Sequence, residues 1–331
     1  MKTIKKQKNP RRGAKLVVLI PALNEEKTIG GVISSIPKKI NGIGEIAALV
    51  VDDGSTDNTT GAAKAKGAKV VSHSVNRGLG VAFSTGIENA LGMGADVIVN
   101  IDADGQFNSG DIAEIVQPVL RGEADMVTCS RFLDRDNEPE MPAVKKFGNA
   151  VFTRIVNALT GGNFTDTQCG FRAYSRDAAM KMTLFHNYTY TQEAFLNLAN
   201  RGCKIVEMPF KVTGQREGKS RIVGNVFVYG IRALVIIVRT IRDYKPLEFF
   251  ASIGAGFLAI GFALGTAIFI HWLSTGMTSP YTSLISVSVL MLVLGFILIV
   301  LALIADMNER QRKMQEEILY MMKKGRGENS D

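Results

Sequence analysis

Two long apolar stretches near the carboxyl end constrain this chain more than any other feature. No lysine or arginine occurs between Leu247 and Ala305. Within that region, Leu247–Leu273 and Leu284–Ala305 each exceed the ~20 apolar residues that a helix needs to cross a bilayer. The short polar segment Ser274–Tyr281 separates them. We therefore expect a transmembrane hairpin, and a buried helical hairpin of a soluble protein is the alternative.

Positive charge flanks this hairpin on its two outer sides. The flanking residues are Arg232, Arg239, Arg242, Lys245, Arg310, Arg312 and Lys313. Lysine and arginine near spans mark the cytoplasmic side, so we expect a multi-pass protein of the cell membrane with both termini and the large domain ahead of the spans in the cytoplasm. The net charge of +8 suits an anionic partner. We expect the membrane bilayer and an anionic substrate as partners, and no nucleic acid.

The chain divides into five parts by composition. We predict a basic disordered arm (1–14), a large cytoplasmic domain (15–222), an amphipathic juxtamembrane helix (223–245), two transmembrane helices (246–306) and a charged cytoplasmic tail (307–331). Glycines in apolar spans favour helix association, so a homo-oligomer is one expectation. The glycines concerned are Gly254, Gly256, Gly261 and Gly265.

The stretch Val97–Ile101 is β-branched and apolar at every position except Asn100, which suits a buried strand. It ends in Asp102-Ala103-Asp104, which places two carboxylates on one side if the strand geometry persists. Like charges held this close favour a hard cation, Mg²⁺ or Mn²⁺, and Gln106 offers a further oxygen. A polar turn whose aspartates accept from local amides is the alternative.

Further apolar stretches alternate with helical segments ahead of and behind this strand, which predicts an α/β fold with a mostly parallel sheet and flanking helices. The predicted strands are Leu16–Ile20, Ala47–Val51, Lys69–Ser72, Met126–Cys129 and Lys204–Val212, and helices are predicted at Asp111–Arg121 and Pro142–Leu159. Three strands end in polar motifs, DDGS, DAD and Ser130-Arg131. Ligands bind at the carboxyl edge of such sheets, so a nucleotide and a metal are expected to share this edge.

Two loops supply further candidate ligands. Arg77 and the glycine amide of Gly78 lie near a helix start, which suits phosphate. Asn24, after the first strand, is expected to cap a helix with Glu25 in its first turn. No GxGxxG follows that strand, which disfavours a Rossmann dinucleotide site.

The motifs PALNEE, DDGSTD, NRG, DADGQ, SR and TDTQCGFR occur in this order ahead of the predicted anchor. Together they resemble the family 2 glycosyltransferases, which have the GT-A fold. The resemblance is closer to the dolichyl-phosphate mannose synthase branch, which includes polyprenyl-phosphate glycosyltransferases, and it covers about Leu16 to Ile222. It implies inverting transfer of a sugar from a UDP- or GDP-sugar to a polyprenyl phosphate, with Mg²⁺ or Mn²⁺ as cofactor.

The resemblance also implies roles for individual residues. The nucleotide-binding set is Pro21, Asn24, Glu25, Asp53, Arg77, Gly78 and Asp102. The metal ligands are Asp102, Asp104 and Gln106. The lipid-phosphate set is Arg131, Lys145, Lys146, Arg172, Arg216 and Lys219, with Asp104 and Arg131 counted as catalytic. It stays open whether Lys145 or Lys146 reaches the phosphate, and whether Glu193 is catalytic. Because a phosphate acceptor needs no strong general base, no histidine is expected near these motifs.

Other functions fit this sequence less well. A processive polysaccharide synthase would carry a QxxRW motif, but the one tryptophan, Trp272, lies inside the first span. A sugar-1-phosphate nucleotidyltransferase would need a glycine-rich phosphate loop after the first strand, and the PALNEE segment found there is not such a loop. A family 2 transferase with another membrane acceptor, or a non-catalytic nucleotide-sugar-binding scaffold, stays as the alternative.

Overall fold

The computed structural model describes residues 13–134, 141, 143–184, 190–212, 235 and 238–328. The chain forms two compact units. One comprises Met1–Arg221 together with Leu319–Asp331, and the other comprises Ile222–Ile318. The predicted basic arm falls almost wholly outside the described residues. Of the predicted juxtamembrane helix, only 235 and 238–245 are described.

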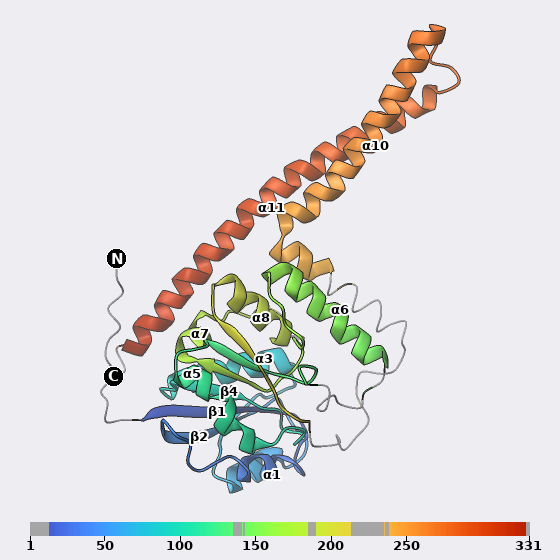
Figure 1. Ribbon diagram of the computed structural model, residues 1–331. Coiled ribbons are helices and arrows are strands. Elements are labelled where there is room, and N and C mark those ends of the chain that lie inside the picture. The colour runs from blue at the N-terminus through green and yellow to red at the C-terminus, as the bar shows by residue number, and fades with distance from the viewer. Residues whose placement is uncertain are drawn as a thin grey trace. The chain divides into compact units, whose positions relative to one another are not determined.

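A seven-stranded sheet in the order β3-β2-β1-β4-β6-β5-β7 forms the centre of the first unit (Figure 1). Its strands are β1 Ala14–Ala22, β2 Ile43–Asp52, β3 Lys69–Ser72, β4 Val97–Asn100, β5 Met126–Ser130, β6 Arg172–Ser175 and β7 Ile205–Pro209. The neighbours β3-β2, β2-β1, β1-β4 and β5-β7 pair in parallel. The predicted mostly parallel sheet is therefore confirmed.

Strand β6 departs from the sequence prediction. No strand is predicted over Thr165–Tyr174, yet its last residues pair antiparallel with both β4 and β5. The segment is only four residues long and mixes arginine, alanine, tyrosine and serine, so it carries no strand periodicity. It is a strand because neighbours on both sides satisfy its backbone, which is a tertiary effect.

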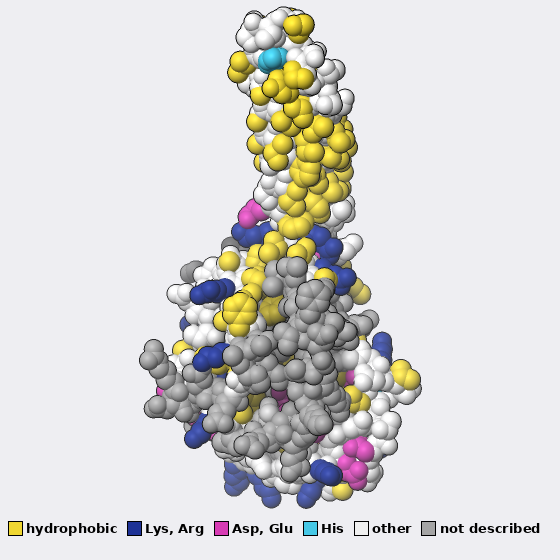
Figure 2. Space-filling view, turned by 90° about the vertical axis from the view of Figure 1, so that its right-hand side faces the viewer, with side chains coloured by type: hydrophobic (Ala, Val, Ile, Leu, Met, Phe, Trp, Pro, Cys, Tyr) yellow, Lys and Arg dark blue, Asp and Glu magenta, His cyan; other side chains and the backbone are white. Residues whose placement is uncertain are grey.

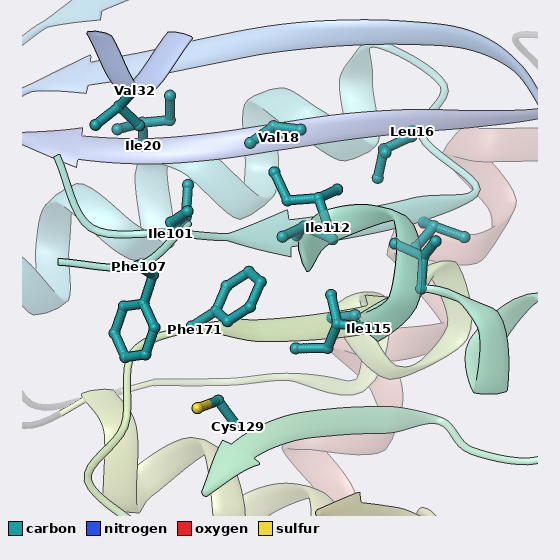
Figure 3. Packing of buried hydrophobic residues seen from close by; sticks show 14 of the residues in the cluster. Leu16, Val18, Ile20, Val32, Ile101, Phe107, Ile112, Ile115, Cys129 and Phe171 are labelled. Atoms are coloured by element: carbon teal, nitrogen blue, oxygen red, sulfur yellow. The ribbon is translucent and has the colours of Figure 1, made fainter. Parts of the chain in front are cut away.

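Helices cover both faces of the sheet, as the alternation of side chains along β1 requires. The helices of this unit are α1 Ile29–Ser34, α2 Thr59–Ala65, α3 Leu79–Gly92, α4 Ile112–Ile115, α5 Gln117–Leu120, α6 Ala143–Thr160, α7 Arg176–Lys181 and α8 Tyr190–Asn200. Leu16, Val18 and Ile20 face Val32 of α1 and Ile112 of α4 within one buried cluster (Figure 3). Every residue from Leu16 to Ile20 is fully buried, so strand β1 forms the middle layer of the core.

Two local predictions are wrong for identifiable reasons. The predicted helix Asp111–Arg121 is broken into a 3₁₀ turn (Ser109–Asp111), α4 and α5. Pro118, near the start of α5, has no N–H to continue the ladder from α4. Asn24 does not cap a helix: α1 begins at Ile29 after Thr28, and Asn24 has a left-handed backbone with φ 54°.

The second unit contains α10 (Pro246–Thr275) and the part of α11 (Thr282–Glu328) up to Ile318. Both are long and apolar enough to cross a membrane. They lie side by side in Figure 1, and hydrophobic side chains cover the face of this pair that Figure 2 shows. Exposed apolar side chains along both helices include Phe262 and Phe296, which suits contact with lipid rather than water.

The span glycines serve the contact between α10 and α11. A Cβ on Gly254 would lie 3.0 Å from the carbonyl oxygen of Gly295, and a Cβ on Gly261 would lie 2.8 Å from Leu292. The Ser288 hydroxyl donates to the carbonyl of Gly261 at 2.8 Å. These small residues therefore let the two helices approach within one chain. The homo-oligomer expected from the same glycines has no support among the described residues.

The end of α11, from Leu319 onward, belongs to the first unit, which contains the sheet. Tyr320 donates its hydroxyl to Asp177 of α7 at 2.7 Å, and Lys323 donates to the carbonyl of Met182 at 3.1 Å. Lys181 pairs with Asp177 at 2.8 Å and lies over the Tyr320 ring. The last part of the predicted charged tail is thus an ordered helical segment packed on α7.

Candidate active site

The carboxyl ends of β1, β2 and β4 meet at one edge of the sheet. The Cα of Ala22 lies opposite Asp52, and Leu19 lies opposite Asn100. The loops continue this pairing, since Asp53 donates its N–H to Ala22 and Ile101 donates to Leu19. The DDGS and DAD motifs therefore leave the sheet on either side of β1.

The two aspartates of DDGS do different work. Asp52 accepts from the Ser55 N–H at 3.0 Å and from the Thr60 hydroxyl at 3.0 Å, which fixes the turn and the start of α2. Asp53 instead accepts from the backbone N–H groups of Arg77 at 2.9 Å and Gly78 at 2.8 Å. Asp53 thus joins the two loops assigned to the nucleotide, at a position that is only 4% exposed.

The PALNEE segment is tied to the same turn. Asn24 accepts from the Thr56 N–H at 2.8 Å, and its own N–H donates to the Ser55 hydroxyl at 2.9 Å. The Glu25 N–H donates to Thr59 at 2.8 Å. Pro21, predicted to end the first strand, instead pairs with Val51 inside β1. The structure therefore brings Pro21, Asn24 and Glu25 beside the DDGS turn.

A histidine lies beside these motifs, contrary to the sequence expectation. Nδ1 of His73 is 2.7 Å from Oδ1 of Asp53. His73 follows β3, twenty residues beyond Asp53, so only the pairing of β2 with β3 brings the two side chains together. The local sequence HSVNRG carries no signal for this contact.

The DAD motif follows β4, with Ile101 and Ala103 buried and Asp102 and Asp104 partly exposed. Asp104 accepts from the Gln106 N–H at 3.1 Å, which folds the loop back on itself. The described residues contain no group of three histidine, cysteine, aspartate or glutamate side chains able to hold a metal. The available donors are hard oxygens from Asp102, Asp104 and Gln106, a set that fits Mg²⁺ or Mn²⁺ completed by oxygens of a ligand.

Gly170 lies so close to Asp102 that any larger residue would displace the Asp102 carboxylate. A Cβ there would lie 2.9 Å and 3.0 Å from the Asp102 carboxylate oxygens and 3.1 Å from the Tyr190 hydroxyl. Asn100 donates to the carbonyl of Gly170 at 2.8 Å and to Tyr190 at 3.1 Å. Burial and the nearby charge of Asp102 raise the pKa of Tyr190 well above its ordinary value. Tyr190 therefore stays a neutral hydroxyl next to this carboxylate.

Arg131 is fixed by a buried carboxylate. Its Nε lies 2.6 Å and its Nη2 3.1 Å from the two oxygens of Asp166, which is fully buried. Burial alone would lower the pKa of Arg131, but the hydrogen bond and charge of Asp166 raise it above its ordinary value. The side chain remains 21% exposed. Two of five guanidinium N–H groups meet Asp166, so others can reach a ligand.

Glu207 of β7 holds the loop that carries Asp166, a role that no local sequence pattern predicts. Its carboxylate accepts from the N–H groups of Thr165 and Asp166, each at 2.9 Å. Burial raises the pKa of Glu207, although these hydrogen bonds favour its charged form. Asn157 of α6 holds Phe164, the residue before Thr165. Its side-chain amide donates to the carbonyl of Phe164 and accepts from the N–H of Phe164, each at 2.9 Å.

The residues predicted for lipid phosphate are placed differently from one another. Arg172 is fully buried, donates to the carbonyls of Thr191 and Thr167, and lies over the Phe195 ring. Because its guanidinium serves the interior, we now assign it to the framework of the site rather than to phosphate. Lys146 is exposed on α6, and Lys145 lies in α6 with its side chain outside the described part.

Three further candidate residues remain from the sequence analysis. Arg216 and Lys219 lie outside the described residues. Glu193 is buried in the first turn of α8, 7% exposed, and its role stays open.

The sequence matches the model of Glycosyl transferase family 2 over residues 17–183. The chain belongs to this family. A functionally uncharacterised protein of Methanocaldococcus jannaschii is 35% identical over 72% of this chain and 97% of its own length. The UDP-N-acetylglucosamine–dolichyl-phosphate N-acetylglucosaminyltransferase of Methanococcus voltae is 32% identical over 59% of this chain and 84% of its own. This protein is a glycosyltransferase.

Other relatives are named as transferases of sugars to dolichyl, undecaprenyl or polyprenol phosphate, which supports the predicted branch of the family. The GT-A fold is confirmed by the crystal structure of glucosyl-3-phosphoglycerate synthase from Mycobacterium tuberculosis with UDP. It matches with a TM-score of 0.52 and 24% identity, over 68% of this chain and 80% of that one.

We predict that Gly170→Ala lowers sugar transfer at least tenfold while leaving the protein folded. The added methyl group would meet the Asp102 carboxylate at 2.9 Å, so the carboxylate has to leave its position. The measurement is the rate of transfer as a function of Mn²⁺ concentration, with half-activation moving to higher concentration. Gly31→Ala is the matched control, because a Cβ at Gly31 meets nothing within 4 Å. Transfer by Gly170→Ala with wild-type metal dependence would contradict this account of the site.

We further predict that Glu207→Gln lowers the free energy of unfolding by about 1–3 kcal/mol and slows transfer, because the amide NH₂ would face an N–H donor of Thr165 or Asp166. Chemical denaturation and initial rates measure the two effects. Glu123→Gln changes an exposed glutamate paired with Arg121 and should shift stability by less than about 0.5 kcal/mol. Equal behaviour of the two variants would show that Glu207 does not hold the loop.

Proposed function

We propose that this protein transfers a sugar, with inversion, from a nucleoside diphosphate sugar to a polyprenyl phosphate at the membrane surface. The observation that carries the proposal is the arrangement at one sheet edge: Asp53 with the Arg77–Gly78 loop, the Asp102–Asp104 pair, and Arg131. The two apolar helices and the acceptor in the name of the Methanococcus voltae relative, dolichyl phosphate, support a lipid acceptor.

The chain's residues would divide the reaction between them. Pro21, Asn24, Glu25 and Asp53 hold the base and ribose of the donor. The Arg77 side chain serves its phosphates, since the N–H of Gly78 is already donated to Asp53. Asp102, Asp104 and Gln106 hold a divalent cation. When bound, that cation neutralises the charge that builds on the leaving nucleoside diphosphate.

The acceptor enters as an anion. A phosphate oxygen of the lipid attacks the anomeric carbon, the bond to the diphosphate breaks, and the configuration inverts. The nucleophile already carries its charge, so no side chain has to remove a proton. Arg131, held in one orientation by Asp166, offers N–H groups to the acceptor phosphate.

Helix α6 gives this acceptor a route from the bilayer. Phe147 is 72% exposed, exposed Lys146 precedes it, and exposed Arg154 lies about two turns further along on the same face. An apolar ring flanked by cations is typical of a helix at a lipid interface. Thr153 and Val156 on the opposite side are buried, which fixes the helix to the catalytic unit.

The test is a donor panel with the full-length protein in detergent, polyprenyl phosphate, Mg²⁺ or Mn²⁺, and each common UDP- and GDP-sugar. We expect glycolipid from one donor, with transfer lost in EDTA and in Asp104→Ala, which should keep its circular dichroism. Glu45→Ala, an exposed site paired with Lys15, is the control. Nucleotide release without glycolipid would favour another acceptor, and silence across the panel would favour the scaffold.

We propose that the Ser274–Tyr281 turn faces outward and both termini face the cytoplasm. The natural cysteines at 129, 169 and 203 are buried, so introduced cysteines report topology. A membrane-impermeant maleimide should label Met277→Cys in intact cells and Asn308→Cys only after permeabilisation. Both positions are exposed. The opposite labelling pattern would reverse the proposed orientation.

A further inference from the structure

One buried histidine of the site takes no part in the chemistry described above. His73 has 7% of its side chain exposed, and its partner Asp53 has 5%. Nδ1 lies 2.7 Å from Oδ1 of Asp53, and Nε2 lies 3.1 Å from the hydroxyl of Thr85 on α3. The ring therefore bridges the DDGS motif and the helix that follows the NRG loop.

The proton positions follow from the chemistry of the partners. A carboxylate oxygen can only accept, so Nδ1 carries the hydrogen of this bond. In the neutral ring Nε2 then accepts from the Thr85 hydroxyl. His73 thus donates a charge-assisted hydrogen bond to Asp53, a stronger bond than one between neutral groups.

His73 also limits what Asp53 can do. A carboxylate has about four acceptor positions. On Oδ1, Asp53 accepts from His73 and the N–H of Arg77, and on Oδ2 it accepts from the N–H of Gly78. Three donors from the described part of the chain hold the group, which leaves one position, on Oδ2, for a ligand.

The surrounding backbone leaves the carboxylate little freedom. Gly54, which follows Asp53, has φ 76°, and a Cβ there would lie 2.6 Å from the carbonyl carbon of Val75. The DDGS turn and the NRG loop are therefore in direct contact. His73, which follows β3, bonds to Asp53 beside this contact.

We propose that His73 is a positioning residue for the donor nucleotide. It holds Asp53 so that the remaining acceptor position on Oδ2 meets a hydroxyl of the ribose or an N–H of the base. This inference rests on the proposed function, because it takes the ligand to be a nucleoside diphosphate sugar. It assigns His73 an effect on donor binding and none on the transfer step.

Two substitutions separate the two bonds of the ring. The amide nitrogen of asparagine stands as many bonds from Cα as Nδ1, and that of glutamine as many as Nε2. His73→Asn therefore keeps the donor to Asp53, whereas His73→Gln keeps only the partner of Thr85. Ser72→Ala, at the exposed neighbouring position, is the matched control.

The experiment measures UDP and GDP binding by calorimetry, and KM and kcat for the donor, on the full-length protein. We expect His73→Gln to weaken nucleotide binding and raise KM about 10-fold to 100-fold with kcat nearly unchanged. His73→Asn should stay within about threefold of the wild type. Asp53→Asn should also weaken binding, and its combination with His73→Gln should add little, since both act through one carboxylate.

Other outcomes overturn the inference. Wild-type affinity in His73→Gln, equal losses in His73→Asn and His73→Gln, or fully additive losses with Asp53→Asn would each show that the bond to Asp53 does not set donor binding. A fall in kcat alone would do the same. If the wild type binds neither UDP nor GDP, the proposed function fails as well, so the two failures are distinguishable.

Discussion

The parallel pairing of β1 with β2 on one side and β4 on the other is the constraint on which the site depends. It forces the loops after three strands to leave the sheet at the same edge. The pairing persists beyond the strands, where Asp53 and Ile101 donate to β1. The fully buried run Leu16–Ile20 anchors this arrangement, so the position of the polar site is set by an apolar core.

The antiparallel strand β6 supplies what the parallel strands cannot. It delivers the loop before Arg172 to the edge where Asp102 lies, and Gly170 is the point of closest approach. A buried guanidinium would be costly without partners. Arg172 meets two backbone carbonyls and the ring of Phe195, and it therefore stabilises the loop from within. The loop in turn carries Asp166, so the position of Arg131 depends on this strand.

The sequence allowed the sheet, the anchor and most site loops to be predicted because those features are local. Apolar runs bounded by polar motifs mark β1, β2 and β4, and the uncharged stretch after Pro246 marks α10 and α11. Residues whose roles depend on tertiary contacts were missed or misassigned. Arg172 was predicted to bind phosphate, because its burial depends on neighbours that the local sequence does not show. The roles of His73 and Glu207 were not predicted, because their partners lie far away in the chain.

A division of roles among the cations explains how this site would bring two anions together. In the proposed reaction, the diphosphate of the donor and the phosphate of the acceptor must approach each other, and each needs its own counter-charge. Arg131 is paired with a buried carboxylate at 2.6 Å, so much of its charge is already neutralised, and what it contributes is orientation. We propose that the net positive potential for the acceptor comes from exposed cations such as Lys146 and Arg154 on α6. In this proposal orientation and charge come from different residues, Arg131 for the first and the exposed cations of α6 for the second.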